Sequence, residues 1–159
     1  MSSPSKAALK AELLARLGAD LATLEGAYRA TIEGATHEEA KPENDKDTRA
    51  LEQSYLARGQ AARIDELRAS IAGVTALALR GFDDGPAALG ALVSVDEDGE
   101  ESTLLVGPCG GGARLAGGTV QVVTPSSPLG RALLGKQAGD DVEIVVAGKR
   151  RAMQVVRVA

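Results

Sequence analysis

A heptad stripe of apolar residues near the N-terminus is the feature that most constrains the fold of this chain. Leu14, Leu17, Leu21, Leu24 and Tyr28 are separated by three, four, three and four residues, and this spacing turns with a helix rather than with a strand. A lone helix leaves such a stripe in water, so it needs a partner. The spacing therefore predicts a long helix over about residues 5–36 that packs against a second helix.

The partner helix is predicted between residues 47 and 76. It carries an apolar stripe at the same spacing, formed by Ile64, Leu67, Ile71 and Val74. Upstream of this stripe lies a second apolar group, formed by Leu51, Tyr55 and Leu56. The two groups are out of register with each other, and Gly59 lies in the gap. We interpret this segment as a helix with a local break near Gly59.

The segment between the two stripes predicts a turn. Pro42 is incompatible with a helix interior, and the pair Asn44-Asp45 favours a turn, so the helices form an antiparallel hairpin that reverses at about residues 38–47. From Glu33 to Asp47 there are six carboxylates and two lysines, an excess equal to the formal charge of −4 of the whole chain. A solvated loop explains such a cluster. The alternative is that carboxylates at the end of a rigid rod enter a site on another molecule.

The second half of the chain predicts a small β-rich domain. Fourteen of the nineteen glycines follow residue 76, and they separate short β-branched or alternating runs at 91–95, 102–106, 119–123, 142–146 and 152–158. One segment, 128–136, predicts a short helix instead, with Ser126 or Ser127 as its cap and Gly135 as its stop. The fold class is α+β: an antiparallel coiled coil (1–76), a linker (77–89) and a β-rich domain (90–159).

Composition excludes several classes of protein. A net charge of −4 over 159 residues argues against a free-standing DNA-binding protein, and the apolar runs are too short to span a membrane. Cys109 is the single cysteine and His37 the single histidine, so we expect no internal disulfide, no structural zinc site and no self-contained catalytic triad. A reducing, cytoplasmic setting is the default expectation.

A glycine-rich pattern at residues 130–136 has the spacing of a phosphate-binding loop. Gly130 and Gly135-Lys136 match its fixed positions, but Gln137 stands where Ser or Thr should bind magnesium, and the residues between are helix formers, three of the four apolar. The pattern therefore predicts a helix rather than a nucleotide site.

The same segment resembles a known family. The sequence VVTPSSPLGRALLGK at 122–136, followed by Gly-Asp-Asp-Val at 139–142, is similar to the C-terminal signature of the Gre transcript-cleavage factors of bacterial RNA polymerase. The resemblance implies an FKBP-like domain with one short helix, following the coiled coil. It also implies that this domain binds the rim of the polymerase secondary channel while the coiled-coil tip reaches the active centre.

The resemblance implies a function that depends on a partner. The tip carboxylates of the family help hold a magnesium ion shared with the polymerase, which hydrolyses backtracked RNA, so the factor has no active site and no cofactor of its own. The expected partner is bacterial RNA polymerase, with an indirect relation to the 3′ end of nascent RNA and weak contact with DNA or RNA in the complex. We expect a cytoplasmic monomer without membrane contact.

The family motifs nominate two groups of residues. The family tip reads Asp-x-x-Glu-Asn; here Glu43-Asn44 match its second half, Ala40 occupies the Asp position and Glu39 stands beside it. We expect Glu39 and Glu43 to be the magnesium ligands, assisted by Asn44 and Asp45, with Asp47 in reserve.

The second group is the docking motif: Ser127, Pro128, Leu129, Gly130 and Arg131. An alternative to docking by all five residues remains open. In it, Pro128 starts a helix, Leu129 is a core residue, and Arg131 alone is the exposed contact. Three functions stay open: stimulation of cleavage, occupation of the channel without cleavage, and an unrelated coiled-coil interaction module.

Overall fold

The computed structural model describes residues 4–39 and 46–159, and these form two compact units. One unit is residues 16–71, and the other joins residues 1–15 to residues 72–159. Each unit has its own internal packing, so each is considered by itself. The division at residues 76 and 89 stays a prediction.

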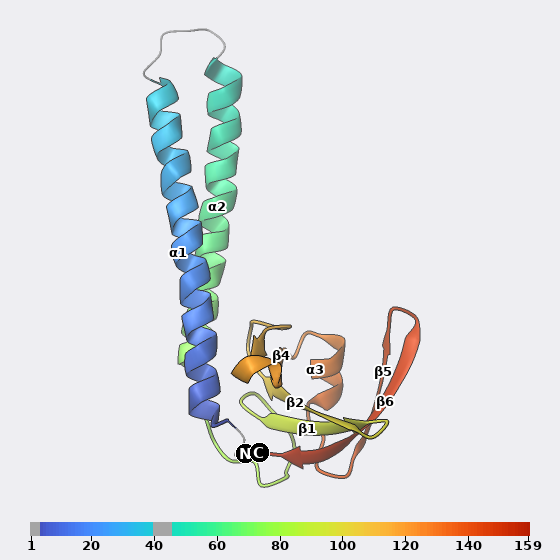
Figure 1. Ribbon diagram of the computed structural model, residues 1–159. Coiled ribbons are helices and arrows are strands. Elements are labelled where there is room, and N and C mark those ends of the chain that lie inside the picture. The colour runs from blue at the N-terminus through green and yellow to red at the C-terminus, as the bar shows by residue number, and fades with distance from the viewer. Residues whose placement is uncertain (1–3, 40–45) are drawn as a thin grey trace. The chain divides into compact units, whose positions relative to one another are not determined.

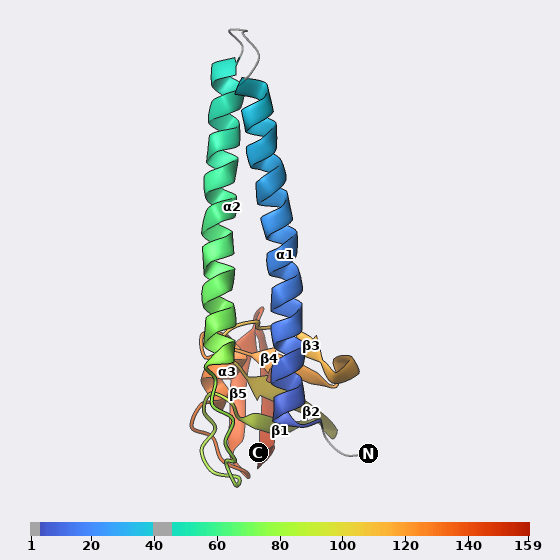
Figure 2. The ribbon, with the colours of Figure 1, turned by 90° about the vertical axis from the view of Figure 1, so that its left-hand side faces the viewer.

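Two long helices follow each other in the first half of the chain: α1 (Lys6–Glu39) and α2 (Lys46–Thr75). In the unit of residues 16–71 they lie side by side, as both ribbon views show (Figures 1 and 2). Arg68 of α2 lies 3.7 Å from Glu25 of α1, whereas Gln53, earlier in α2, lies opposite Gly34, later in α1. The helices are therefore antiparallel, as the predicted turn between the two stripes requires.

The prediction of a break in the second helix was wrong. α2 is continuous through Gly59, and Leu51, Tyr55 and Leu56 are each more than half exposed. The face turned toward α1 carries Ala50, Gln53, Ala57 and Gln60 instead, in register with Ile64. The heptad repeat is thus unbroken, but small and polar residues occupy its first two heptads.

The second unit is built on a six-stranded mixed sheet (Figure 1). Its strands are β1 (Leu92–Glu97), β2 (Glu100–Val106), β3 (Arg114–Leu115), β4 (Val120–Val123), β5 (Asp141–Val146) and β6 (Lys149–Val158), in the spatial order β3-β4-β2-β1-β6-β5. Neighbouring strands are antiparallel except β2 and β4, which are parallel. The α+β fold class is confirmed. The two-residue strand β3, at the edge of the sheet, was not predicted.

Tight turns join the hairpin strands of this sheet. Asp98 and Gly99 between β1 and β2, and Ala147 and Gly148 between β5 and β6, all have positive φ. Two consecutive residues of positive φ give a turn whose twist matches that of the flanking strands. Asp96 Oδ1 accepts a hydrogen bond of 2.8 Å from the backbone N–H of Gly99 and closes the first turn.

The core of this unit is aliphatic with one aromatic residue. It lies between the sheet and the short helix α3 (Pro128–Leu133), and consists of Phe82, Ala87, Ala91, Val93, Val95, Leu104, Val106, Val123, Leu133, Val142, Ile144, Met153, Val155 and Val158. The first turns of α1 belong to the same unit, because Leu9 and Leu13 are buried there. A side chain on Gly110 would lie 3.0 Å from Leu13 Cδ1, so glycine permits this close approach.

Candidate functional site

The sequence motif at 127–131 forms the start of helix α3. Ser127 is its N-cap: its backbone is extended (φ −76°, ψ 154°) and its Oγ accepts a hydrogen bond of 3.0 Å from the backbone N–H of Gly130. The same hydroxyl donates to the carbonyl oxygen of Thr124 at 2.8 Å. Pro128 occupies the first turn, where its missing N–H costs nothing. Of the two serines proposed as caps, Ser127 is the one used.

Gly130 is fixed by the turn that precedes the helix. A Cβ at position 130 would lie 1.8 Å from the carbonyl oxygen of Thr124 and 2.9 Å from Ser127 Oγ. Since real Cβ atoms are not found this close to a backbone oxygen, only glycine fits here. Gly130 is also buried, so its role in the motif is to let the capping turn close.

The motif divides into structural and accessible residues. Leu129 is half-buried and packs against the core of the sheet, while Pro128 and Arg131 are exposed. Arg131 Nη2 donates to the carbonyl oxygen of Ser126 at 3.1 Å, which holds the guanidinium beside the capping turn. The alternative interpretation of Leu129 as a core residue is therefore supported, and Arg131 is the charged group that the motif presents to solvent.

The acidic connection between α1 and α2, residues 38–47, lies partly outside the described residues, which do not include 40–45. Glu39 is the last residue of α1, and Asp47 lies in the first turn of α2. Glu43, Asn44 and Asp45, together with Ala40, fall in the segment 40–45, which lies outside the described residues. Within residues 4–39 and 46–159, no three His, Cys, Asp or Glu side chains are grouped so as to hold a metal ion. The assignment of Glu39 and Glu43 as magnesium ligands stays a prediction.

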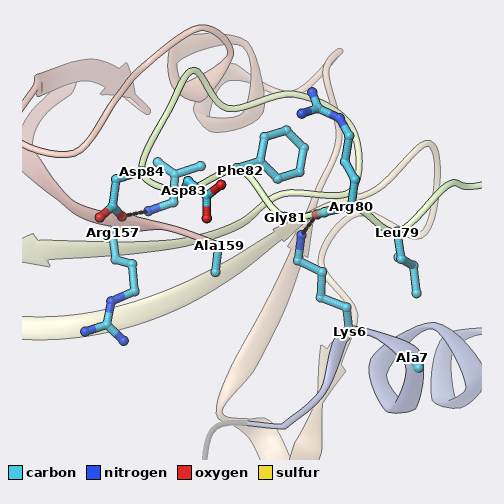
Figure 3. A pocket seen from close by; sticks show the side chains of 11 residues that line it. Lys6, Ala7, Leu79, Arg80, Gly81, Phe82, Asp83, Asp84, Arg157 and Ala159 are labelled. Carbon is cyan, nitrogen blue, oxygen red and sulfur yellow. Dashed lines mark hydrogen bonds between the residues drawn. The ribbon is translucent and has the colours of Figure 1, made fainter.

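A second cluster, around Phe82, was not predicted from the sequence (Figure 3). Lys6 Nζ lies 4.6 Å and Arg80 Cζ 3.9 Å from the centre of the Phe82 ring, within the range of cation–π attraction. Lys6 Nζ also donates to the backbone carbonyl oxygen of Arg80 at 2.7 Å. Burial, and secondarily the charge of Arg80, lower the pKa of Lys6. Arg80 and Phe82 are close in the sequence, but no local sequence pattern predicts that Lys6, which is far from them in the sequence, contacts them.

This cluster anchors the first turn of α1 to the sheet unit. A hollow of about 580 Å³ lies beside it, and Asp83, Asp84 and Arg157 also line it. Asp84 Oδ1 accepts a hydrogen bond of 2.9 Å from the backbone N–H of Val158, which ties the segment that carries Phe82 to β6. Further along α1, Glu12 accepts a hydrogen bond of 2.8 Å from the backbone N–H of Ala116. These contacts fix the start of α1 within the sheet unit.

The chain consists of a helical hairpin followed in sequence by a mixed sheet with one short helix. This helix is capped by Ser127 and presents Arg131 to solvent. These features define a class of protein with a helical hairpin and a small β-rich domain. Residues 84–159 match the sequence model of the family described as "Transcription elongation factor, GreA/GreB, C-term". Residues 84–159 therefore carry the C-terminal domain of the Gre family of transcription elongation factors.

Solved structures of similar chains were also found. The chain is 20% identical to the GreA factor homolog 1 (Gfh1) protein of Thermus thermophilus, covering 92% of this chain and 94% of that one with a TM-score of 0.40. It is 22% identical to Gfh1 of Thermus aquaticus, covering 90% and 91% with a TM-score of 0.40. It is 19% identical to the elongation factor GreA/GreB of Nitrosomonas europaea, covering 71% and 92% with a TM-score of 0.39.

Two negative findings accompany these matches. Comparison with curated protein sequences gave no match. In the part of the chain that the structure describes, neither α1, α2 nor α3 has the length and apolar content needed to cross a bilayer. The family assignment thus depends on the C-terminal domain.

Proposed function

We propose that this chain binds bacterial RNA polymerase at its secondary channel and stimulates the cleavage of backtracked nascent RNA. The observation that carries the proposal is the match of residues 84–159 to the GreA/GreB C-terminal domain. The position of Arg131, exposed beside a rigid capping turn, supports it because a docking residue has to be both accessible and fixed.

Docking in this proposal depends on α3. Ser127 and Gly130 shape the turn, Leu129 attaches the helix to the core, and Pro128 and Arg131 contact the polymerase. An arginine suits this position because its planar group binds carboxylates with two hydrogen bonds. The partner surface is expected to be acidic at the point that Arg131 contacts.

Cleavage in this proposal depends on the acidic connection between α1 and α2. Glu39 and Glu43 supply carboxylate oxygens, the ligands that magnesium prefers, while Asn44 and Asp45 assist. These residues would hold an ion shared with the polymerase active centre, and such an ion would supply part of the charge stabilisation of a two-metal hydrolysis. The hydrolysis belongs to the polymerase, and the chain acts as an accessory factor without a cofactor of its own.

A second candidate function follows from Ala40. The family motif has an aspartate at this position, and alanine supplies no ligand. On this alternative the chain occupies the channel and modulates the polymerase without supporting cleavage.

A transcript-cleavage experiment separates the two candidates. Backtracked complexes of polymerase are incubated with the wild-type chain or with the Glu39→Ala, Glu43→Ala double variant, and transcript lengths are measured. Shortened transcripts with the wild type alone support the proposal. Slower nucleotide addition without shortening, from either protein, supports the modulating role, and equal shortening by both proteins contradicts the assignment of the two glutamates.

A binding experiment tests docking independently of cleavage. Arg131→Glu is expected to weaken binding to polymerase at least about tenfold. The change replaces a positive charge by a negative one, which would be repelled by the acidic surface expected on the polymerase. Arg114→Glu makes the same charge change at another exposed arginine, in β3, and is the control. Equal affinities of the two variants and the wild type would contradict docking through α3.

A further inference from the structure

The contact between α1 and α2 changes in character along the hairpin of residues 16–71. On α2, side chains that are not exposed recur every three or four residues at Ala50, Gln53, Ala57, Gln60, Ile64, Leu67 and Ile71, and the half-buried Ala61 and Ser70 flank this row. This is one continuous heptad stripe. Its members from Ile64 onward are large and aliphatic, whereas the members before Ile64 are alanine or glutamine.

The facing stripe of α1 shows the same change. Its inner part carries Leu17, Leu21 and Leu24, and its outer part carries Tyr28, Thr31 and Gly34. Thr31 Oγ1 donates to the carbonyl oxygen of Ala27 at 3.0 Å, so its polar group is satisfied within its own helix. Gly34 lies opposite Gln53, whose Nε2 would be 3.8 Å from a Cβ at position 34. The outer part of the hairpin therefore has few aliphatic side chains between its helices.

The two glutamines of this outer part are poorly accommodated. The Oε1 atoms of Gln53 and Gln60 are both buried, and neither has a hydrogen-bond partner among the residues that the structure describes. A buried amide oxygen without a partner has lost its bonds to water and gained none in return. It favours any conformation that returns it to solvent, which is what separation of the two helices does.

The large apolar residues of the outer part do not compensate. Leu51, Tyr55 and Leu56 of α2 point away from α1 and are 55%, 61% and 55% exposed. They contribute little to the pairing of the helices, because apolar surface stabilises an association only when it leaves water. Ile64, at the start of the inner part, is only 5% exposed.

We infer that the outer part of the hairpin, residues 28–39 with 46–60, opens as a unit while the inner part stays closed. The boundary lies between Gln60 and Ile64, where the stripe changes from polar to aliphatic. This inference rests on the packing of the hairpin and holds whether or not the chain stimulates cleavage. Its consequence is that the acidic connection is carried on a segment that separates from its partner helix without global unfolding.

Hydrogen exchange of the full chain, followed by mass spectrometry, tests the inference. Amides of 50–60, which have acceptors within α2, are expected to exchange about 100-fold faster than those of 64–71, because local opening needs less free energy than global unfolding. Their protection should be nearly uniform up to residue 60 and rise in one step beyond it. Simple fraying of helix ends gives a gradual increase over the first turns instead, and that result would overturn the inference.

A pair of variants tests the cause of the opening. Gln53→Leu with Gln60→Leu removes both unpaired oxygens and continues the aliphatic stripe, so exchange of 50–60 should slow at least about 30-fold. Ser54→Leu adds the same side chain to the same segment at an exposed position and is the control, with a change below about threefold. Equal effects of the two changes, or no effect of the glutamine changes, would show that the glutamines do not control opening. Exchange in the sheet unit should stay constant in both.

Discussion

Gly130 lies so close to Thr124 that a Cβ at position 130 would be 1.8 Å from the carbonyl oxygen of Thr124. The two residues are the ends of the turn that starts helix α3, and Ser127 between them bonds to both. A residue that looks like part of a contact motif thus has a structural function, and the contact itself falls to its neighbour Arg131.

Replacing Gly130 by alanine should destabilise the sheet unit and displace Arg131. The added methyl group overlaps a backbone oxygen that has no flexible side chain to move, so the free energy of unfolding should fall by at least about 2 kcal/mol. Urea denaturation measures the loss. Gly59→Ala is the control: in the described part of the chain nothing lies within 4 Å of a Cβ at position 59, and this change should stabilise α2 by about 0.5–1 kcal/mol. A neutral effect of Gly130→Ala would contradict the packing of the turn.

Replacing Ser127 by alanine should remove the helix cap. The backbone N–H of Gly130 loses its acceptor, at a cost of about 1 kcal/mol in the free energy of unfolding. Ser127→Thr keeps the hydroxyl and should recover most of the loss. If the alanine and threonine variants are equally stable in urea, the cap makes no contribution.

Much of α3 was predictable because its determinants are local. A serine before a proline and a glycine just after the last turn are start and stop signals that act within a few residues. The cluster of Lys6 with Arg80 and Phe82 was not predictable, because Lys6 is separated from Phe82 by the whole hairpin. The parallel pairing of β2 with β4 also escaped prediction, because nothing within either strand specifies which strand it pairs with.

The hairpin shows how a correct period was assigned to the wrong residues. Leu51, Tyr55 and Leu56 are the large apolar residues in the first half of α2. Hydropathy therefore assigned the apolar stripe to them, and their register with Ile64 then required a break at Gly59. The stripe runs through Gln53 and Gln60 because the aliphatic inner part fixes the register of the whole helix. Of the acidic connection, the sequence predicted Glu39 and Glu43 as ligands, and this stays a prediction.

The stability of the sheet unit should depend on the protonation of Lys6. Burial and Arg80 hold its pKa below the ordinary value of 10.5, so near and below this value the unfolded chain binds the proton more tightly than the folded chain. Stability from this residue is therefore present above pH 10.5 and lost as the pH falls through the folded pKa.

Titration of the Lys6 side chain by NMR measures this effect. Arg80→Met should raise its pKa only part of the way, because burial is the larger cause. Full restoration of the ordinary value would contradict that order of causes, and an unchanged pKa would exclude a contribution from Arg80.

The ion pair of Glu97 and Arg151 should contribute little to stability. Arg151 makes hydrogen bonds of 2.8 to 3.2 Å with both carboxylate oxygens of Glu97, and these bonds raise the pKa of Arg151. The side chains are 46% and 30% exposed, so water and salt screen the attraction. A double-mutant cycle with alanine at both positions should give a coupling below about 1 kcal/mol that decreases with salt. A larger coupling that is independent of salt would contradict this.

The assignment of residues 1–15 to the same compact unit as residues 72–159 has a consequence for synthesis of the chain. Leu9 and Leu13 leave the ribosome early, but residues 72–159, with which they form one compact unit, are made only after the whole hairpin. Until then the two leucines remain in water. For the same reason, a fragment that starts after α2 lacks part of its own interior, so the sheet should be expressed with the first turns of α1 attached.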